Sequence, residues 1–250
     1  MTVVSLDGYR DPLVVVTRPF PDCTRTAHQA EEVGFETFEE PLGVVSYFPL
    51  SDNPLPDACG VVLTSHRAVH SLSSLSFRKT PVFYVVGERT ALTLRQNGFE
   101  DIAVTCATVE NLLQWMGKHA ATIRTPMVYL RGRDISAPVL QVLQQKGFET
   151  EEHIVYAVDQ TESFSEEFKN ILKADRTLII IIMSARTADS FVKLTGRFKR
   201  DSKADLRFLC YSPKIAQIIE KEGYNAVEYC DDPTEDSLIQ KLMLMYDEKI

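Results

Sequence analysis

The sequence predicts an α/β fold made of two doubly wound lobes, each a parallel sheet with helices on both faces. Short apolar strands alternate with amphipathic helices and turns, without the long hairpins of antiparallel sheets. One β-α-β unit also occurs twice. Gly34-Phe35-Glu36-Thr37 returns as Gly147-Phe148-Glu149-Thr150, and Arg18 returns as Arg131 at the same separation (147 − 34 = 113 and 131 − 18 = 113). In a chain of 250 residues, this duplication favours two lobes over one large domain.

The elements of the first half follow from apolar runs and from the residues that bound them. Leu13–Val16 reads as a buried parallel strand, and a helix over residues 22–33 closes at Gly34, a residue type that commonly ends helices. A polar, proline-rich stretch at residues 51–56 marks a boundary. The other expected elements are a strand at 60–63, a helix capped by Thr64 or Ser65, a strand at 81–86, a helix between Gly87 and Gly98, a strand at 102–104 and a helix from Thr108 through Trp115.

The second half repeats this order. Its expected elements are a strand at 127–130, a helix at 136–146, an extended segment at 147–156, a strand at 178–183 ending at Ser184, a strand at 208–210 followed by Ser212, and a helix after Thr234. The separations of equivalent residues grow from 113 to 184 − 65 = 119, 223 − 98 = 125 and 234 − 108 = 126. Homologous halves that differ in loop length are expected to show this gradual growth.

The composition excludes several classes of function. A net charge of −8 argues against nucleic acid and acidic membranes as partners, because binding phosphates requires a basic surface. The basic cluster within residues 197–207 is interpreted as a solvated loop. The most apolar run, residues 178–183, is far shorter than the roughly 20 residues of a spanning helix, and the first ten residues lack a signal-peptide core, so we expect a cytoplasmic protein. The five cysteines have no metal-binding spacing and are expected to be free, buried thiols.

A set of short motifs resembles, in order and spacing, those of the uroporphyrinogen-III synthase family. The motifs are Thr17-Arg18-Pro19, Leu63-Thr64-Ser65 with Arg67-Ala68-Val69, Val85-Val86-Gly87 with Thr90-Ala91, Arg131-Gly132, Val155-Tyr156 and Pro233-Thr234. The resemblance covers nearly the whole chain. It implies two flavodoxin-like lobes joined by a two-stranded connector, with the active site in the cleft between them.

The resemblance also implies that one lobe is discontinuous. Residues 1–38 join residues 160–250 in this arrangement, residues 46–150 form the other lobe, and residues 39–45 and 151–159 are connector strands. The residues themselves support it, because both connectors are extended, follow the same duplicated unit and can therefore pair with each other. Two consecutive lobes are the alternative that the sequence leaves open.

Parallel sheets bind ligands at the carboxyl ends of their strands, where helix N-termini present free N–H groups. The residues at these positions are Thr17, Ser65, Gly87, Arg131, Ser184 and Ser212. None of them forms a nucleophile–base pair, a metal cluster or a phosphate-binding glycine loop. His66 and His70 are four residues apart but have no third ligand. The pattern favours an enzyme without metal or cofactor, whose substrate reacts readily and must mainly be held in one shape.

The substrate implied by the resemblance is hydroxymethylbilane, a linear tetrapyrrole that carries carboxylates on every ring. The family closes it with ring D inverted and with loss of water, which gives uroporphyrinogen III. Tyr156 matches the family's connector tyrosine, and its phenol is expected to donate to the departing hydroxyl; the alternative role is packing between the lobes. Thr90 matches a threonine that faces the cleft, with helix capping as its alternative. A monomer that receives its substrate from hydroxymethylbilane synthase is the expected state.

Other residues are candidates for binding substrate carboxylates. Arg18 and Arg131 are expected to pair with them, with surface ion pairs as the alternative. Ser65 and Ser184 are expected to cap helices and to contact carboxylates. The chain departs from the family at Ser212-Pro213-Lys214-Ile215, where many members have two threonines; Lys214 is expected to replace those hydroxyls.

Two other classes of function remain open. A two-lobed binding or regulatory protein without catalytic activity is compatible with the same fold, because fold does not determine function. A sugar- or nucleotide-binding enzyme would be supported by a glycine fingerprint such as G-x-G-x-x-G, which the sequence lacks.

Overall fold

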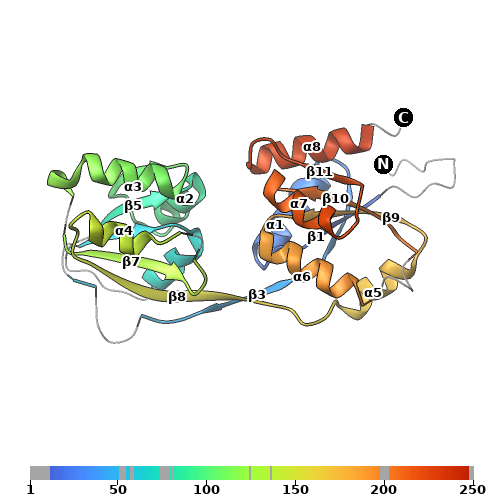
Figure 1. Ribbon diagram of the computed structural model, residues 1–250, viewed down its shortest axis with the longest axis horizontal. Coiled ribbons are helices and arrows are strands. Elements are labelled where there is room, and N and C mark those ends of the chain that lie inside the picture. Colours follow the sequence, from blue (N-terminus) through green and yellow to red (C-terminus); the bar gives the residue numbers. More distant parts are fainter. Residues whose placement is uncertain are drawn as a thin grey trace. The chain divides into compact units, whose positions relative to one another are not determined.

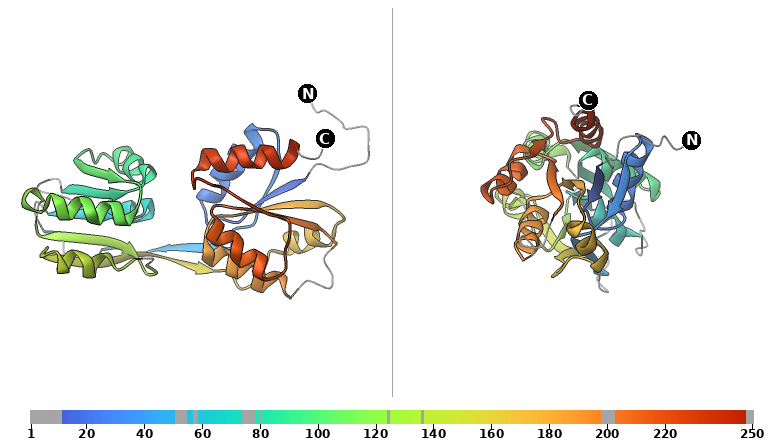
Figure 2. Two further views of the ribbon diagram at one scale, coloured as in Figure 1. Left: turned by 45° about the horizontal axis from the view of Figure 1, so that its top comes forward. Right: turned by 90° about the vertical axis from the view of Figure 1, so that its right-hand side faces the viewer.

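The structure, a computed structural model, describes residues 12–50, 55–56, 59–73, 79, 81–123, 125–135, 137–197 and 203–247. The chain divides into two compact units, each described here by itself. The terminal lobe comprises the described residues up to Val44 and from Asp159 onward, and the middle lobe is Val45–Val158. Each consists of one sheet with helices on both faces (Figures 1 and 2).

The terminal lobe has a five-stranded sheet in the order β11-β10-β9-β1-β2, in which all neighbours are parallel. Its strands are β1 (Leu13–Val16), β2 (Glu36–Glu39), β9 (Thr177–Ile182), β10 (Asp205–Cys210) and β11 (Val227–Tyr229). Its helices are α1 (Asp22–Glu32), α5 (Glu166–Lys173), α6 (Ala185–Thr195), α7 (Pro213–Lys221) and α8 (Glu235–Asp247). Successive residues of a strand face opposite sides of the sheet. In β9, Ile180 packs with α5, α6 and α7 on one side, whereas Ile179 packs with α1 and α8 on the other.

The middle lobe has a six-stranded sheet in the order β3-β8-β7-β4-β5-β6. Its strands are β3 (Gly43–Tyr47), β4 (Gly60–Leu63), β5 (Val82–Val86), β6 (Ile102–Cys106), β7 (Met127–Gly132) and β8 (Thr150–Gln160). Its helices are η1 (His66–Leu72), α2 (Glu88–Gln96), α3 (Val109–Lys118), η2 (Ala120–Thr122) and α4 (Val139–Gln145). Helices η1 and α2 cover one face, and α3 and α4 cover the other.

The two sheets have the same strand order, which confirms the predicted fold class. The terminal lobe reads β2-β1-β9-β10-β11 and the middle lobe reads β8-β7-β4-β5-β6, with β3 added beside β8. The terminal lobe follows the flavodoxin-like order, in which the crossover direction changes between the first and third strands, β1 and β9. In the middle lobe the same spatial arrangement is entered at β4, so the direction changes between β4 and β7. Gly34 and Gly147 end the equivalent helices α1 and α4 with φ of +97° and +85°, a conformation that glycine adopts without steric cost.

The extended segments that link the lobes differ from each other. The first is interrupted, with β2 in one sheet and β3 in the other, whereas the second is the single 11-residue strand β8. Strand β3 lies beside β8 in the sheet order. Phe48 N donates to the Val155 carbonyl (2.9 Å), and Thr161 N donates to the Leu42 carbonyl (3.2 Å). The two segments therefore run antiparallel to each other. The expected pairing of the two extended segments is therefore present.

Several element boundaries differ from the prediction. The helix capped by Ser65 is a 3₁₀ helix; the hydroxyls of Ser71 and Ser73 donate to carbonyls three residues earlier, in keeping with its tighter turns. Helix α4 begins at Val139, after Pro138, and Ser136 lies outside the described residues. Of the basic cluster predicted as a loop, Arg207 lies in β10 and pairs with Asp205 (3.0 Å), and residues 198–202 lie outside the described part.

The cysteines match the prediction closely. All five are free; four are buried and Cys106 is half-buried. Burial raises the pKa of Cys23 and of Cys210 to about 12, so both stay protonated at neutral pH. Among the described helices, none is long and apolar enough to cross a membrane.

Candidate functional site

A small cavity lies in the middle lobe at the point where the crossover direction changes, at the carboxyl ends of β4 and β7. Its volume is about 130 Å³. Its lining residues are Thr64, Ser65, Val109, Tyr129, Gly132, Asp134, Ile135, Ala137, Val139 and Tyr156. Ligands of open parallel sheets commonly bind at such a point. The cavity is therefore the candidate site in this lobe.

Tyr156 enters this cavity from β8 because the pairing of β7 and β8 is irregular there. Arg131 pairs with Ile154, but the next residue, Gly132, pairs with Tyr156, so one residue of β8 is skipped. The phenol ring lies directly over Gly132. A Cβ at that position would be 2.7 Å from Tyr156 Cζ and 2.9 Å from its hydroxyl oxygen. Glycine is thus required for Tyr156 to occupy this place.

A second tyrosine lines the same cavity. The Tyr129 and Thr64 hydroxyls are 3.1 Å apart and hydrogen-bonded. Burial raises the pKa of Tyr129, and the nearby Tyr156 adds to the increase. Tyr129 therefore keeps its proton at neutral pH and can donate a hydrogen bond.

Arg131, predicted to bind substrate, is held by intramolecular contacts. Its Nε and Nη2 donate to the two Glu152 oxygens at 2.8 and 2.7 Å, a bidentate pair. Its Nη1 donates to the carbonyls of Gly132 and Arg133 at 2.9 and 3.1 Å. The hydrogen bonds to Arg131 hold the pKa of Glu152 below its usual range. Arg131 thus ties the irregular end of β7 to β8, beside Tyr156.

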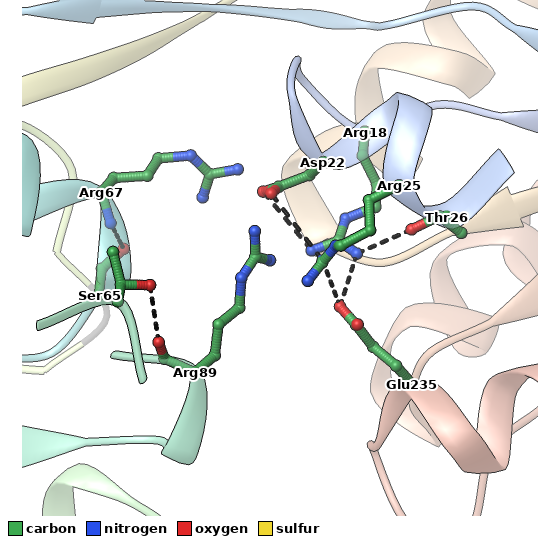
Figure 3. Close-up of polar contacts among 9 residues, drawn as sticks. Arg18, Asp22, Arg25, Thr26, Ser65, Arg67, Arg89 and Glu235 are labelled. Carbon is green, nitrogen blue, oxygen red and sulfur yellow. Dashed lines mark hydrogen bonds and ion pairs between the residues drawn. The ribbon is translucent and has the colours of Figure 1, made fainter. Parts of the chain in front are cut away.

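The other predicted residues of this lobe lie at the ends of β4 and β5. Ser65 caps η1 by accepting from Arg67 N (3.3 Å) and also lines the cavity. Gly87 precedes α2 with φ of +85°, and Thr90 is buried in its first turn. Arg67 and Arg89, which the sequence analysis did not propose, are half-buried in the first turns of η1 and α2. Figure 3 shows both arginine side chains near Ser65.

The equivalent edge of the terminal lobe contains a network of charged groups (Figure 3). Arg18 Nη1 donates to Glu235 and to the Thr26 hydroxyl, both at 3.0 Å, and Arg18 Nη2 is 3.6 Å from Asp22. Arg25 contacts the same two carboxylates. Asp22 is only 1% exposed. Arg18 is therefore held within its own lobe.

The remaining predicted residues of the terminal lobe have different environments. Thr17 is fully buried and its hydroxyl donates to the Ile181 carbonyl (2.7 Å), which ties β1 to β9. Ser184 is exposed and caps α6 by accepting from Thr187 N (3.1 Å). Ser212 precedes α7 without a side-chain capping bond, and Lys214 is exposed in its first turn. Hydroxyl groups available to a ligand are therefore those of Ser184 and Ser212, and not that of Thr17.

Comparison with known proteins identifies the family. The sequence model described as uroporphyrinogen-III synthase HemD matches residues 24–240, most of the chain. The chain belongs to the uroporphyrinogen-III synthase family. A search of curated proteins finds no match.

Solved structures of this family have the same fold. The uroporphyrinogen-III synthetase of Helicobacter pylori 26695 is 18% identical with a TM-score of 0.61, over 94% of this chain and 100% of that one. A mutant uroporphyrinogen III synthase of the extremely thermophilic bacterium Thermus thermophilus is 12% identical with a TM-score of 0.52, over 96% of this chain and 100% of that one. At these identities the similarity establishes the fold alone.

Two residues that line the cavity, Tyr129 and Asp134, were not predicted from the sequence. Tyr129 lies within the apolar run Met127–Leu130, where a buried aromatic residue is expected in any case. Its proximity to Tyr156 depends on how β7 and β8 pair. Asp134 lies two residues after the Arg131-Gly132 motif, and this spacing is the sequence signal that could have identified it as a residue of the site.

No group of three or more potential metal ligands occurs in the described part of this synthase-family chain. His70, one of the two histidines considered as a metal pair, is exposed and its ring lies 4.2 Å from that of Tyr47, centroid to centroid.

Proposed function

We propose that the chain cyclises hydroxymethylbilane, with inversion of ring D and loss of water, to uroporphyrinogen III. Family membership supports the reaction. The observation that carries the proposal is the position of Tyr156, over Gly132 and in the wall of a cavity at the switch point of the sheet. The cavity of about 130 Å³ is large enough for one substituent or the departing hydroxyl, and not for a tetrapyrrole. The prediction that the substrate lies between the lobes stays a prediction.

Tyr156 is proposed to donate a hydrogen bond to the departing hydroxyl. A phenolic O–H is a hydrogen-bond donor, and it can stabilise the oxygen as negative charge develops. Tyr129, whose pKa is raised by burial, supplies a second protonated phenol in the same wall. We expect the effect of removing one hydroxyl to be moderate, because the substrate loses water readily.

The substrate carboxylates are proposed to bind at the carboxyl edges of the sheets. Ser65 and Ser184 contribute hydroxyls at the starts of helices η1 and α6. Arg67 and Arg89 add positive charge at the edge of the middle lobe. For Arg18 and Arg131 the role in substrate binding stays a prediction; a substrate acid would have to displace Glu235 or Glu152.

The test is a coupled assay. Hydroxymethylbilane is generated from porphobilinogen by its deaminase, the protein is added, and the oxidised type I and type III uroporphyrins are separated by chromatography. We expect type III in proportion to the protein. Tyr156→Phe is expected to lower the rate by about tenfold, less than the usual roughly 10²–10⁴-fold of acid–base catalysis, because the substrate loses water readily. Tyr246→Phe, which removes a phenol that packs on Phe35, is the matched control.

A binding or regulatory protein without catalytic activity is the alternative. Unchanged type I product in the presence of folded protein would favour it and would contradict the proposed reaction. Direct transfer of the substrate from hydroxymethylbilane synthase also stays a prediction. The same assay tests it: direct transfer would make the rate of type III formation depend on the deaminase concentration even when the supply of hydroxymethylbilane is held constant.

A further inference from the structure

A second, larger groove lies in the terminal lobe, beside helix α6 and the end of β8 (both labelled in Figure 1). Its volume is about 640 Å³, within the range of roughly 300–1,000 Å³ for small-molecule sites. One wall is a stripe along α6 and its end, at the spacing of a single helix face. The lining residues are Gln160, Thr161, Glu162, Arg186, Asp189, Ser190, Lys193, Leu194 and Arg197. None of them is assigned to the tetrapyrrole above.

The groove contains unsatisfied polar atoms. Gln160 Oε1 and Thr161 Oγ1 are buried and have no hydrogen-bond partner within the described part of the chain. The backbone that carries both side chains is held in the fold, because Gln160 is the last residue of β8 and Thr161 N donates to the Leu42 carbonyl (3.2 Å). A buried polar group without a partner typically costs about 1–3 kcal/mol. Such a cost is understandable where a ligand completes the hydrogen bonds.

The charges of the groove indicate the chemistry of that ligand. Arg186, Lys193 and Arg197 contribute three cations, in a chain whose net charge is −8. Arg197 Nη1 also donates to the Glu162 carbonyl (3.1 Å), which holds the turn after β8 against the end of α6. The carboxylates of Glu162 and Asp189 lie in the same lining. Cations alone would suit any anion, but carboxylates and an amide oxygen require hydrogen-bond donors on the ligand.

We propose that this groove binds a small polyhydroxylated anion, a sugar phosphate or a sugar acid. The anionic group pairs with Lys193 and Arg197. Ligand hydroxyls donate to Gln160 Oε1 and to the carboxylates, and one of them pairs with the Thr161 hydroxyl. This site goes beyond the proposed synthase reaction and does not depend on it.

The experiment is calorimetric titration of the full chain at constant ionic strength with four probes: D-glucose 6-phosphate, D-gluconate, D-glucose and inorganic phosphate. We expect saturable binding of at least one of the first two, and binding of glucose and phosphate at least about tenfold weaker, or about 1.4 kcal/mol. Binding of glucose 6-phosphate alone identifies a phosphate ligand, and binding of gluconate alone a sugar acid. Binding of neither, or equal binding of inorganic phosphate, overturns the proposal.

Variants locate the binding. Lys193→Gln combined with Arg197→Gln is expected to weaken it at least tenfold, whereas Lys221→Gln, an exposed lysine on α7 outside the groove, leaves it unchanged. Thr161→Val is expected to weaken binding several-fold without lowering the unfolding temperature of the free protein, because the hydroxyl it removes has no partner there. Thr161→Ser, which keeps the hydroxyl, should bind normally. Undiminished binding by the Lys193/Arg197 double variant contradicts the assignment.

Discussion

The two lobes share one β-α-β frame but differ at the carboxyl edge of its first strand. Arg18 and Arg131 are equivalent in the duplication, and so are Glu39 and Glu152 (152 − 39 = 113). In the middle lobe the arginine binds its own glutamate at 2.7 and 2.8 Å. In the terminal lobe Arg18 binds Asp22 and Glu235 instead, and Glu39 accepts from the Thr24 hydroxyl (2.8 Å).

The residues that take the place of these carboxylates explain the difference. Asp22 corresponds to Ile135 (135 − 22 = 113), and Glu235 corresponds to Val109 (235 − 109 = 126). Ile135 and Val109 both line the cavity that contains Tyr156. Where the terminal lobe has acidic groups that hold its arginine, the middle lobe has apolar side chains and open space. One copy of the frame is thus closed by ion pairs, and the other is open for a ligand.

Asp22→Asn is expected to have the largest effect on stability. It leaves Arg18 and Arg25 beside a neutral amide in a buried position, and breaking a buried ion pair typically costs about 3–5 kcal/mol; since Arg25 is partly exposed, we expect about 3 kcal/mol. Denaturant unfolding measures it. Ile135→Asn, the equivalent change in the middle lobe, is the control and should cost under about 0.5 kcal/mol, since Ile135 is 52% exposed. Equal losses would contradict the comparison.

Gly132→Ala tests whether the open edge depends on the place of the Tyr156 ring. The added Cβ would lie 2.7 Å from the ring, so the tyrosine must move, with an expected loss of about 1–3 kcal/mol of stability and a fall in type III formation of more than tenfold. Gly117→Ala is the control: its Cβ would meet only the flexible end of Lys146, and it lies in helix α3, where alanine is favoured. Full activity of the Gly132 variant would show that the position of Tyr156 is unimportant.

Glu152→Gln is expected to have the smallest effect, and one that depends on pH. Because Arg131 lowers the folded pKa of Glu152 below its unfolded value near 4.3, the stabilisation is present at neutral pH and is lost as the pH falls through the folded pKa. The variant should be about 1 kcal/mol less stable than the natural protein at pH 7, and the difference should shrink as the pH falls below the unfolded pKa of about 4.3. Unfolding curves at several pH values measure it.

Glu39→Gln, the equivalent change in the terminal lobe, is the matched control for this prediction. Because Arg18 is bound by Asp22 and Glu235, we expect a smaller loss of stability. An equal, pH-dependent loss in both variants would show that the two arginine–glutamate pairs do not differ in the way described.

Much of the fold was predictable because it depends on local signals. Buried strands such as Leu13–Val16 and Gly60–Leu63 were predicted with the boundaries observed. The glycines that end helices, such as Gly34 and Gly147, adopt the positive φ typical of that position. The predicted start of the helix at 136–146 was wrong, because α4 begins only at Val139, after Pro138. The capping of η1 by Ser65 was predicted, but its 3₁₀ geometry, with Ser71 and Ser73 bonded to the preceding turn, was not.

The candidate site was predictable only in part. The sequence placed Ser65 at the end of a strand and Tyr156 in the second connector, and both line the cavity. The alternative role of Arg18 and Arg131, ion pairing within the protein, was left open by the sequence, and both arginines are paired in the structure. The partners of an arginine depend on which strands and helices lie next to it, which spacing along the chain does not reveal.

By itself, the sequence determined the order of strands and helices, the duplication and the family resemblance, because periodicity, capping residues and repeats are properties of neighbouring residues. Tertiary structure decided how the two copies differ. The cavity beside Tyr156 exists because the pairing of β7 with β8 skips a residue at Gly132, and the ion pairs of Arg18 exist because α8 brings Glu235, 217 residues away, to the same edge. Contacts over such separations depend on the packing of whole elements and appear only when the chain has folded.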